Sequence, residues 1–135
     1  MIASFGIIPF RKLNGKWQVL LIQHLSGQHW GFPKGRAKET ETAQETAIRE
    51  LKEETGLRVQ QILSLKPFTE SYYLQKKAKT VSYFPALVTG VLECQPDEVV
   101  QARWFDLDEA IKKISFLESQ NVFKQAKKYL DGYIT

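Results

Sequence analysis

The sequence has little cysteine and no long apolar run, and each lack excludes a class of protein. Its single cysteine, Cys94, has no partner within the 135 residues, so an internal disulfide is excluded. This usage fits a reducing cytoplasm, where a lone cysteine is expected to be buried and unreactive. No stretch approaches the roughly 18 consecutive apolar residues that a membrane helix needs. The segment MIASFGIIPF has no basic residue before its apolar stretch, so we do not expect a secretory signal.

The chain also lacks a strong excess of charge of either sign. Its net charge is +4, which favours anionic partners without establishing one. No arginine-rich run or other nucleic-acid motif is present, so nucleic-acid binding is not expected. Apolar residues make up 43% and charged residues 25%, which excludes disordered and fibrous classes. The length suits a single domain over residues 1–135, large enough to bury a core without disulfides or metals.

The charges that are present are unevenly placed. Residues 36–54 carry six acids and four bases, so the rest of the chain holds 15 bases and 9 acids. An acidic segment attracts cations and a basic surround attracts anions. Together they suit a metal-dependent enzyme that acts on a polyphosphate. On charge alone, a solvent-exposed Glu/Lys helix on an ordinary basic protein is the simpler interpretation.

Strand patterns dominate the chain, with helical patterns between them. The runs typical of strands are 2–10, 16–23, 57–65, 67–74, 80–92 and 102–105, and the helical patterns are 42–55, 107–114 and 118–130. Asn14 and Gly15 predict a tight hairpin, Pro85 predicts an edge strand or a bulge, and Asp106 predicts a helix cap. The run WQVLLIQ predicts a strand covered on both faces. The expected class is α+β, a mixed β-sheet sandwiched between α-helices.

Carboxylates gather on one stripe of the helix predicted over 42–55. At about 100° per residue, Glu50 and Glu54 lie one turn apart on the same stripe, and Glu53 lies beside Glu50. Ala43 and Ala47 lie along that stripe and leave space there. Three carboxylates this close repel one another unless cations neutralise them. Clustered hard oxygen ligands of this kind suit Mg²⁺ or Mn²⁺.

Two further residues border this stripe, and each allows two interpretations. Arg49 lies beside Glu53, where its guanidinium can orient a ligating carboxylate, or it forms an ordinary exposed pair one turn along the helix. Gly35 ends the turn ahead of the helix. Its backbone carbonyl can join a metal shell there, or the glycine only permits a tight turn.

Nine residues of this region resemble the Nudix box, G-x5-E-x7-R-E-U-x-E-E-x-G-U, with no departure: Gly35, Glu41, Arg49, Glu50, Leu51, Glu53, Glu54, Gly56 and Leu57. The chance of such a match per window is on the order of 10⁻⁹ at average residue frequencies. The resemblance implies the Nudix fold and hydrolysis of a nucleoside diphosphate linked to another moiety, with Mg²⁺ or Mn²⁺. It implies that Glu50, Glu53 and Glu54 are metal ligands, one of them a candidate general base. Glu41 and Arg49 are implied as supporting residues.

Segments outside the box resemble one branch of this family, the asymmetrical diadenosine tetraphosphate hydrolases. The likeness covers about residues 4–130 and consists of short pieces: 29–35, 79–84, 97–98, 103–104 and Phe116. It implies cleavage of diadenosine tetraphosphate to ATP and AMP. Hydrolysis of RNA 5′-ends or of damaged nucleoside triphosphates is the alternative within the family. A catalytically silent nucleotide sensor is disfavoured, because such domains lose the glutamates. Nothing in the sequence sets an oligomeric state.

The same branch implies residues for the substrate, namely His29, Lys34 and Lys79 at phosphates and Tyr83 and Phe116 stacked on an adenine. Glu98 is implied as a further metal ligand from a loop. Each residue has a structural alternative: an acidic turn for Glu98, solvated lysines, and core packing for the aromatic rings. Tyr83 lies on the strand face opposite Phe84, so at most one of the two points into a given site. The expected partner is a small nucleotide in the cytoplasm.

Overall fold

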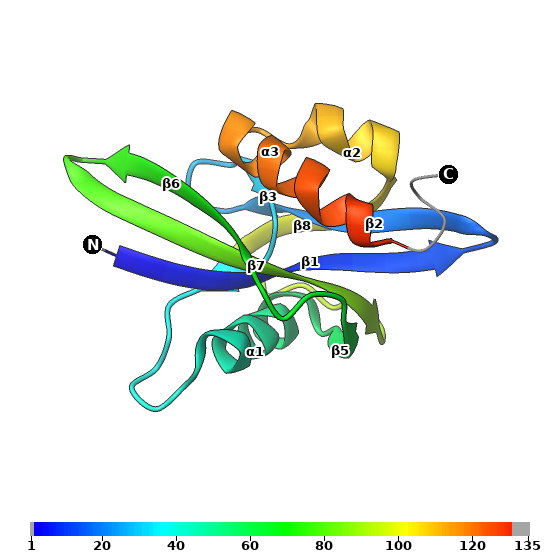
Figure 1. Cartoon of the computed structure of the whole chain (residues 1–135), viewed down its shortest axis with the longest axis horizontal. Coiled ribbons are helices and arrows are strands. Elements are labelled where there is room, and N and C mark those ends of the chain that lie inside the picture. The colour runs from blue at the N-terminus through cyan, green and yellow to red at the C-terminus, as the bar shows by residue number, and fades with distance from the viewer. Residues whose placement is uncertain (1, 131–135) are drawn as a thin grey trace.

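A β-sheet lies between two layers of helices (Figure 1). The computed structural model describes residues 2–130. The long strands are β1 (Ile2–Leu13), β2 (Lys16–His24), β7 (Lys77–Thr89) and β8 (Val99–Asp106), and the shorter ones are β3 (Trp30–Gly31), β4 (Lys34–Gly35), β5 (Arg58–Ile62) and β6 (Phe68–Leu74). Helix α1 (Ala43–Thr55) covers one face of the sheet, and α2 (Leu107–Lys113) and α3 (Leu117–Ala126) cover the other. A short 3₁₀ helix, Lys127–Tyr129, follows α3.

The sheet is mixed, as the sequence predicts. Its main path runs β3-β2-β1-β7-β5, with β4 paired to β1, β6 to β7 and β8 to β2. Strands β1 and β7 are parallel, and β1 and β2 form an antiparallel hairpin. The hairpin turn is formed by Asn14 and Gly15, whose φ angles of 51° and 79° are left-handed. The predicted α+β class is therefore confirmed, and so is the predicted hairpin.

Strand β2 divides the core into two halves. Its residues Val19 and Leu21 join the cluster beneath α2 and α3, whereas Leu20 and Ile22 join the cluster beneath α1, which includes Leu51. All four strand residues are fully buried. This agrees with the prediction of a strand covered on both faces, and it gives α1 a rigid platform of apolar side chains.

Pro85 corrects one expectation, because β7 is neither an edge strand nor bulged at this residue. The antiparallel pairing of β7 with β6 ends at Tyr83, and the pairing with β5 begins at Ala86. Pro85 lies in the interval between these two partners, where its carbonyl accepts from the Leu63 N–H at 2.9 Å. A proline is tolerated inside a sheet at such a point because no ladder bond needs its missing N–H.

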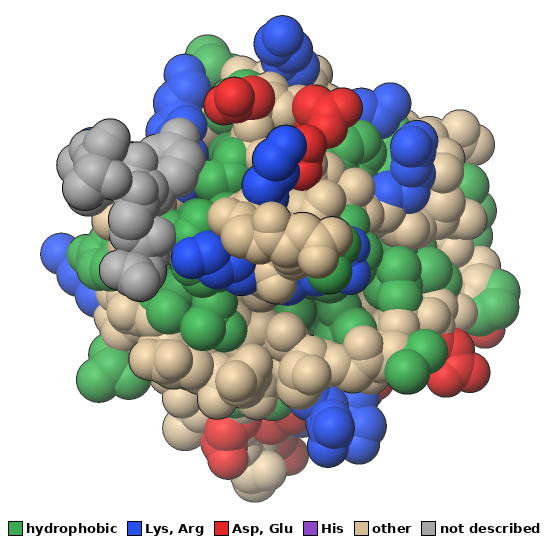
Figure 2. All heavy atoms as spheres, turned by 90° about the vertical axis from the view of Figure 1, so that its right-hand side faces the viewer, with side chains coloured by type: hydrophobic (Ala, Val, Ile, Leu, Met, Phe, Trp, Pro, Cys, Tyr) green, Lys and Arg blue, Asp and Glu red, His purple; other side chains and the backbone are tan. Residues whose placement is uncertain are grey.

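Two smaller expectations also change. Asp106 occupies the N-cap position of α2, but its carboxylate makes no cap bond and instead accepts from Gln18 Nε2 at 3.2 Å. Cys94 is half-buried rather than buried. Within residues 2–130, no helix is long and apolar enough to cross a membrane. Figure 2 shows one face of the molecule, on which Lys and Arg side chains are scattered and do not gather into one basic patch.

Candidate active site

Helix α1 begins and ends where its sequence predicts. The Thr42 Oγ1 accepts from the Glu45 N–H at 3.1 Å, and the Glu45 carboxylate accepts from the Thr42 N–H at 2.9 Å. At the other end, Gly56 adopts a left-handed φ of 75°, and its N–H donates to the Lys52 carbonyl at 2.8 Å. These two caps fix the rotation of the helix and with it the direction of each carboxylate.

Arg49 ties α1 to the loop that precedes it. Its Nη2 donates to Glu41 Oε1 and to the Arg36 carbonyl, both at 3.0 Å. Its Nη1 donates to both oxygens of Glu53 at 3.0 Å and to Glu50 Oε1 at 3.1 Å. The hydrogen bond from Arg49 lowers the pKa of Glu41 from 4.5 to about 2, and the Lys38 N–H adds to this effect. One guanidinium thus bonds three carboxylates, offsets part of their negative charge and holds the loop.

Three carboxylates from distant parts of the chain converge beside this network. One oxygen each of Glu50, Glu54 and Glu98 lie within 4.8 Å of one another. Glu50 and Glu54 come from α1, and Glu98 comes from the loop before β8. Their negative charges and purely oxygen ligands match what a hard divalent cation requires. We call these three residues the acidic cluster.

Glu54 is the most buried member of the acidic cluster, at 2% exposed. Among residues 2–130, no hydrogen-bond partner exists for its buried Oε2. Burial, together with repulsion from Glu50, raises the pKa of Glu54 to about 9. A buried carboxylate oxygen with no protein donor is costly unless a ligand satisfies it, so the cluster fits a bound cation.

Glu53 and Gly35 occupy different positions relative to this cluster. Glu53 points to the outer side of α1, where Arg49 binds both of its oxygens and its side chain is 47% exposed. The structure does not bring Glu53 into the acidic cluster, and its metal role stays a prediction. Gly35 lies directly against Glu50, because a β-carbon on Gly35 would be 2.1 Å from the Glu50 carboxyl carbon. The absence of a side chain on Gly35 therefore leaves the space that the Glu50 carboxylate occupies.

Two cavities adjoin at His24 and Lys34, and the smaller one reaches the acidic cluster. The smaller has a volume of about 420 Å³ and includes Glu54, Asp97 and Glu98 in its lining. The larger has a volume of about 660 Å³ and extends toward β6, β7 and α3. His24 and Lys34 line both cavities, so the two form one continuous site. Volumes of this size accommodate a nucleotide.

All three residues predicted to contact phosphate line the larger cavity: His29, Lys34 and Lys79. Burial lowers the pKa of Lys34, and attraction to Glu54 and Glu70 opposes this shift. Lys34 is thus drawn toward carboxylates on two sides, at the junction of the cavities. Its position agrees with the role predicted for it.

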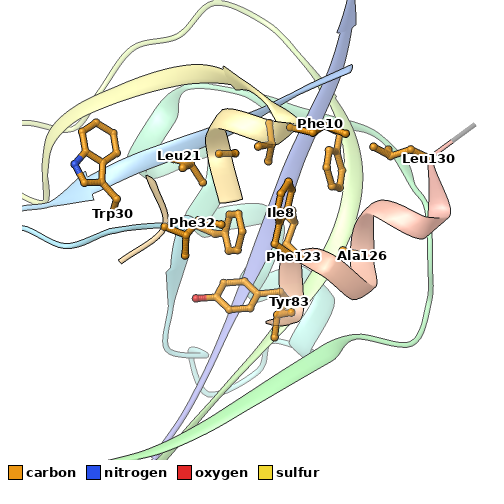
Figure 3. Close-up of a cluster of buried hydrophobic side chains, with 14 of the residues drawn as sticks. Ile8, Phe10, Leu21, Trp30, Phe32, Tyr83, Phe123, Ala126 and Leu130 are labelled. Atoms are coloured by element: carbon orange, nitrogen blue, oxygen red, sulfur yellow. The ribbon is translucent and has the colours of Figure 1, made fainter. Parts of the chain in front are cut away.

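The two aromatic residues predicted to stack on adenine have very different surroundings. Phe116 is 49% exposed at the start of α3, with its ring 5.0 Å from that of His29. Tyr83 is 2% exposed and packs edge-on against Phe32 at 5.3 Å. Figure 3 shows the Tyr83 ring among core side chains, close to Phe123. Stacking needs an open ring face, so this burial does not agree with the predicted role of Tyr83, and Phe116 is the accessible ring.

Sequence reasoning missed several residues that line the larger cavity, among them His24, Glu70, Tyr72 and Ser119. Glu70 and Tyr72 lie in the stretch 69–78, which matches no known motif. Two-residue alternation along that strand does place both side chains on one face. His24 stacks on His29 with ring centres 4.5 Å apart, and burial lowers the pKa of His24 to about 3.

Comparison with known proteins assigns the chain to a family. The family model for the NUDIX domain matches residues 2–126. The chain belongs to the NUDIX family. The box resemblance and the predicted fold are thereby confirmed, and the divalent metal ions that NUDIX hydrolases generally use agree with the acidic cluster.

The matches to individual relatives extend over nearly the whole length of this chain. The asymmetrical bis(5′-nucleosyl)-tetraphosphatase of Rattus norvegicus is 35% identical, and the match covers 93% of this chain and 92% of that protein. The protein of the same name from Caenorhabditis elegans is 28% identical over 98% of this chain and 99% of its own. Among solved structures, the C. elegans Ap4A hydrolase binary complex superimposes with a TM-score of 0.86, covering 98% of this chain and 100% of that one.

Proposed function

We propose that this NUDIX protein is a hydrolase of dinucleoside polyphosphates that cleaves diadenosine tetraphosphate to ATP and AMP with Mg²⁺ or Mn²⁺. One observation carries the proposal: the acidic cluster opens into a continuous site whose far end holds an exposed aromatic ring and whose middle holds Lys34. A dinucleoside polyphosphate has groups in the same order, because its phosphates would lie at the acidic cluster and Lys34 and a base would lie at the aromatic ring. The names of the rat and C. elegans relatives support the same substrate class.

The acidic cluster would hold the divalent cation. Glu50, Glu54 and Glu98 would be its ligands, with the Gly35 carbonyl beside Glu50 as a further candidate. The unpartnered Glu54 Oε2 supports this assignment. When bound, the cation would neutralise charge on the phosphate chain and make water more acidic. Glu53 and Arg49 would act at the border of the cluster by fixing the direction of Glu50.

The remaining residues would bind and orient the substrate. Lys34, Lys79 and His29 would contact phosphate oxygens, and Phe116 would stack on the base, with Tyr72 as a second aromatic residue in the cavity lining. A glutamate of the acidic cluster would accept a proton from the attacking water. The water oxygen forms a bond to phosphorus as the bond from phosphorus to the leaving nucleotide oxygen breaks in line. The positive side chains would hold the phosphates in that alignment.

The test is product analysis by anion-exchange chromatography. The full-length protein is incubated with diadenosine tri-, tetra- and pentaphosphate, 5′-triphosphorylated RNA and an oxidised nucleoside triphosphate. We expect ATP and AMP from the tetraphosphate with Mg²⁺ or Mn²⁺, and no product when EDTA is in excess. Glu109→Gln removes an exposed carboxylate on α2 outside both cavities and serves as the active control. Faster turnover of the RNA or the oxidised nucleotide would contradict the assigned substrate.

A further inference from the structure

Glu70 is a buried carboxylate that the proposed hydrolysis does not use. It lies on β6, is 7% exposed and lines the larger cavity. The Ser119 hydroxyl donates to its two oxygens at 3.0 and 3.2 Å, and the Tyr83 hydroxyl also donates to it. Burial raises the pKa of Glu70, with the Ser119 bond opposing the shift. A buried acid of this kind is costly to keep unless it performs a task.

Glu70, Tyr72 and Phe116 all line the larger cavity. Tyr72 follows Glu70 by two residues, so both side chains point from the same face of β6. Phe116 is the N-cap residue of α3 and Ser119 lies in the first turn of that helix, and both line the larger cavity. The bond between Glu70 and Ser119 joins the two elements. A flat ring bound against Phe116 would therefore share the cavity with the Glu70 carboxylate.

The carboxylates of Glu70 and Glu118 offer hydrogen-bond acceptors to a ligand in the larger cavity, and Lys34, which also lines it, is attracted to Glu70. The single hydroxyl protons of Ser119 and Tyr83 are both given to Glu70. A carboxylate has about four acceptor sites, and these two donors occupy about two of them. Glu118, which also lines the cavity, adds a second carboxylate. An edge of a ligand that carries N–H donors fits such a surface, and an edge that carries only acceptors is repelled.

We propose that Glu70 is a specificity-determining residue that accepts a hydrogen bond from the exocyclic amino group of the nucleobase stacked on Phe116. Ser119 and Tyr83 are the positioning residues that hold its carboxylate in place. The proposal rests on the proposed function for the presence of a base in the larger cavity. It adds to that function a residue that selects among bases, because stacking alone accepts any aromatic ring. Adenine presents the required amino group, and purine without the 6-amino group does not.

The alternative role for Glu70 is a purely structural bond between β6 and α3. That role predicts an effect on stability that is the same whichever base is bound. A role in recognition predicts an effect on nucleotide affinity that depends on whether the base carries the amino group. A comparison of two ligands that differ only in this group therefore separates the two roles.

The experiment measures binding of AMP and of purine riboside 5′-monophosphate by calorimetry, in the full-length protein with Mg²⁺ present. We expect the wild type to bind AMP about 10- to 100-fold more tightly, the usual effect of one hydrogen bond to a charged group. Glu70→Gln keeps the shape and one acceptor oxygen but removes the charge. We expect it to reduce this ratio to about 5-fold or less, mainly by weakening AMP. Glu109→Gln is the charge-matched control and should keep the wild-type ratio.

Two results would overturn the proposal: equal affinity of the wild type for the two nucleotides, or an equal loss for both in Glu70→Gln. Melting temperatures show whether that variant folds. If it does not, Ser119→Ala replaces it, since loss of the positioning hydroxyl should also reduce the ratio. Failure of the proposed function is a separate observation, because it shows as absence of ATP and AMP from diadenosine tetraphosphate, while the two monophosphates still report on Glu70.

Discussion

The α-carbon of Gly35 lies directly against the carboxylate of Glu50. A β-carbon added to Gly35 would be 2.1 Å from the Glu50 carboxyl carbon and 2.1 Å from its Oε2. The backbone of Gly35 is not in the left-handed region, so the glycine is required here for close approach and not for its φ angle. The loop before α1 and the helix itself therefore meet at a contact that only glycine permits.

Gly35→Ala should impair activity far more than stability. The added methyl group meets the end of a flexible side chain, which can rotate away at small cost to the folded state. The Glu50 carboxylate would then leave the acidic cluster. Displacing a metal-ligating group commonly lowers metal affinity about 10- to 100-fold. We expect the Mg²⁺ concentration for half-maximal activity to rise by that factor with a melting temperature within a few degrees of wild type. An unchanged metal requirement would remove Glu50 from the site.

Glu54→Gln should lower kcat by at least about 10²-fold while preserving the fold. The substitution keeps the shape and removes the charge of a buried carboxylate that repels Glu50. Loss of a ligand or a base typically has an effect of this size. In the metal-free protein at neutral pH the melting temperature should hold or rise, because the raised pKa of Glu54 means that folding must protonate this carboxyl, whereas glutamine needs no proton. Near-normal kcat would show that Glu54 lies outside the reaction, and Glu109→Gln provides the comparison.

Glu41 should stabilise the protein in a pH-dependent manner through Arg49. Its pKa is lowered from 4.5 to about 2 in the folded protein, first by the hydrogen bond from Arg49. A lowered carboxyl pKa adds stability that is fully present above pH 4.5 and is lost as the pH falls toward 2. Glu41→Gln should therefore reduce the melting temperature at pH 7, and its difference from wild type should shrink at pH 3. Calorimetry at the two pH values measures this.

The control for that prediction is Glu39→Gln, which changes an exposed carboxylate of the same loop. It should alter the melting temperature little at pH 7. A difference between Glu41→Gln and wild type that stays constant from pH 7 to pH 3 would contradict the ionic origin of the effect.

The sequence predicts the local structure around α1 closely, because the signals are local. Thr42 and Gly56 limit the helix, and the spacing of Glu50 and Glu54 fixes one face. The position of Glu98 depends on how the loop before β8 folds over α1. The periodicity of apolar residues predicts helices and strands but not the path of such a loop. Its placement in the acidic cluster came from family resemblance. Glu53 lies outside the acidic cluster because Arg49, four residues earlier, holds its carboxylate on the outer side of the helix, and its metal role stays a prediction.

The larger cavity was harder to predict because tertiary packing creates it. Glu70 and Ser119 are 49 residues apart in sequence, and their bond forms only when α3 packs on β6. Pro85 suggested an edge strand because sequence shows a missing N–H but not which neighbours need it. The alternation along β7 did predict that Tyr83 and Phe84 face opposite sides, and the structure places them in different core clusters. The alternation did not predict which face of β7 borders the larger cavity.

Phe116 and Tyr83 give opposite predictions when each is changed to alanine. Phe116 is half exposed, so Phe116→Ala should leave the melting temperature nearly unchanged. If its ring stacks on the base, KM should rise about 5- to 150-fold with a smaller change in kcat, since stacking is worth roughly 1–3 kcal/mol. Phe116→Tyr keeps the ring and should restore a near-normal KM. A normal KM in Phe116→Ala would remove the ring from the site.

Tyr83→Ala should act mainly on stability, because its ring is 2% exposed and packs against Phe32. Removing a buried aromatic ring commonly costs about 3–5 kcal/mol, which corresponds to a fall of about 10 °C or more in a domain of this size. Tyr83→Phe keeps the ring and removes only the hydroxyl that donates to Glu70, so its loss should be nearer about 1 kcal/mol. Melting temperature and KM measured on the same four variants decide between the rings. A Tyr83→Ala protein with an unchanged melting temperature and a raised KM would return Tyr83 to the stacking role, because a ring of the packed core cannot be removed without a marked fall in melting temperature.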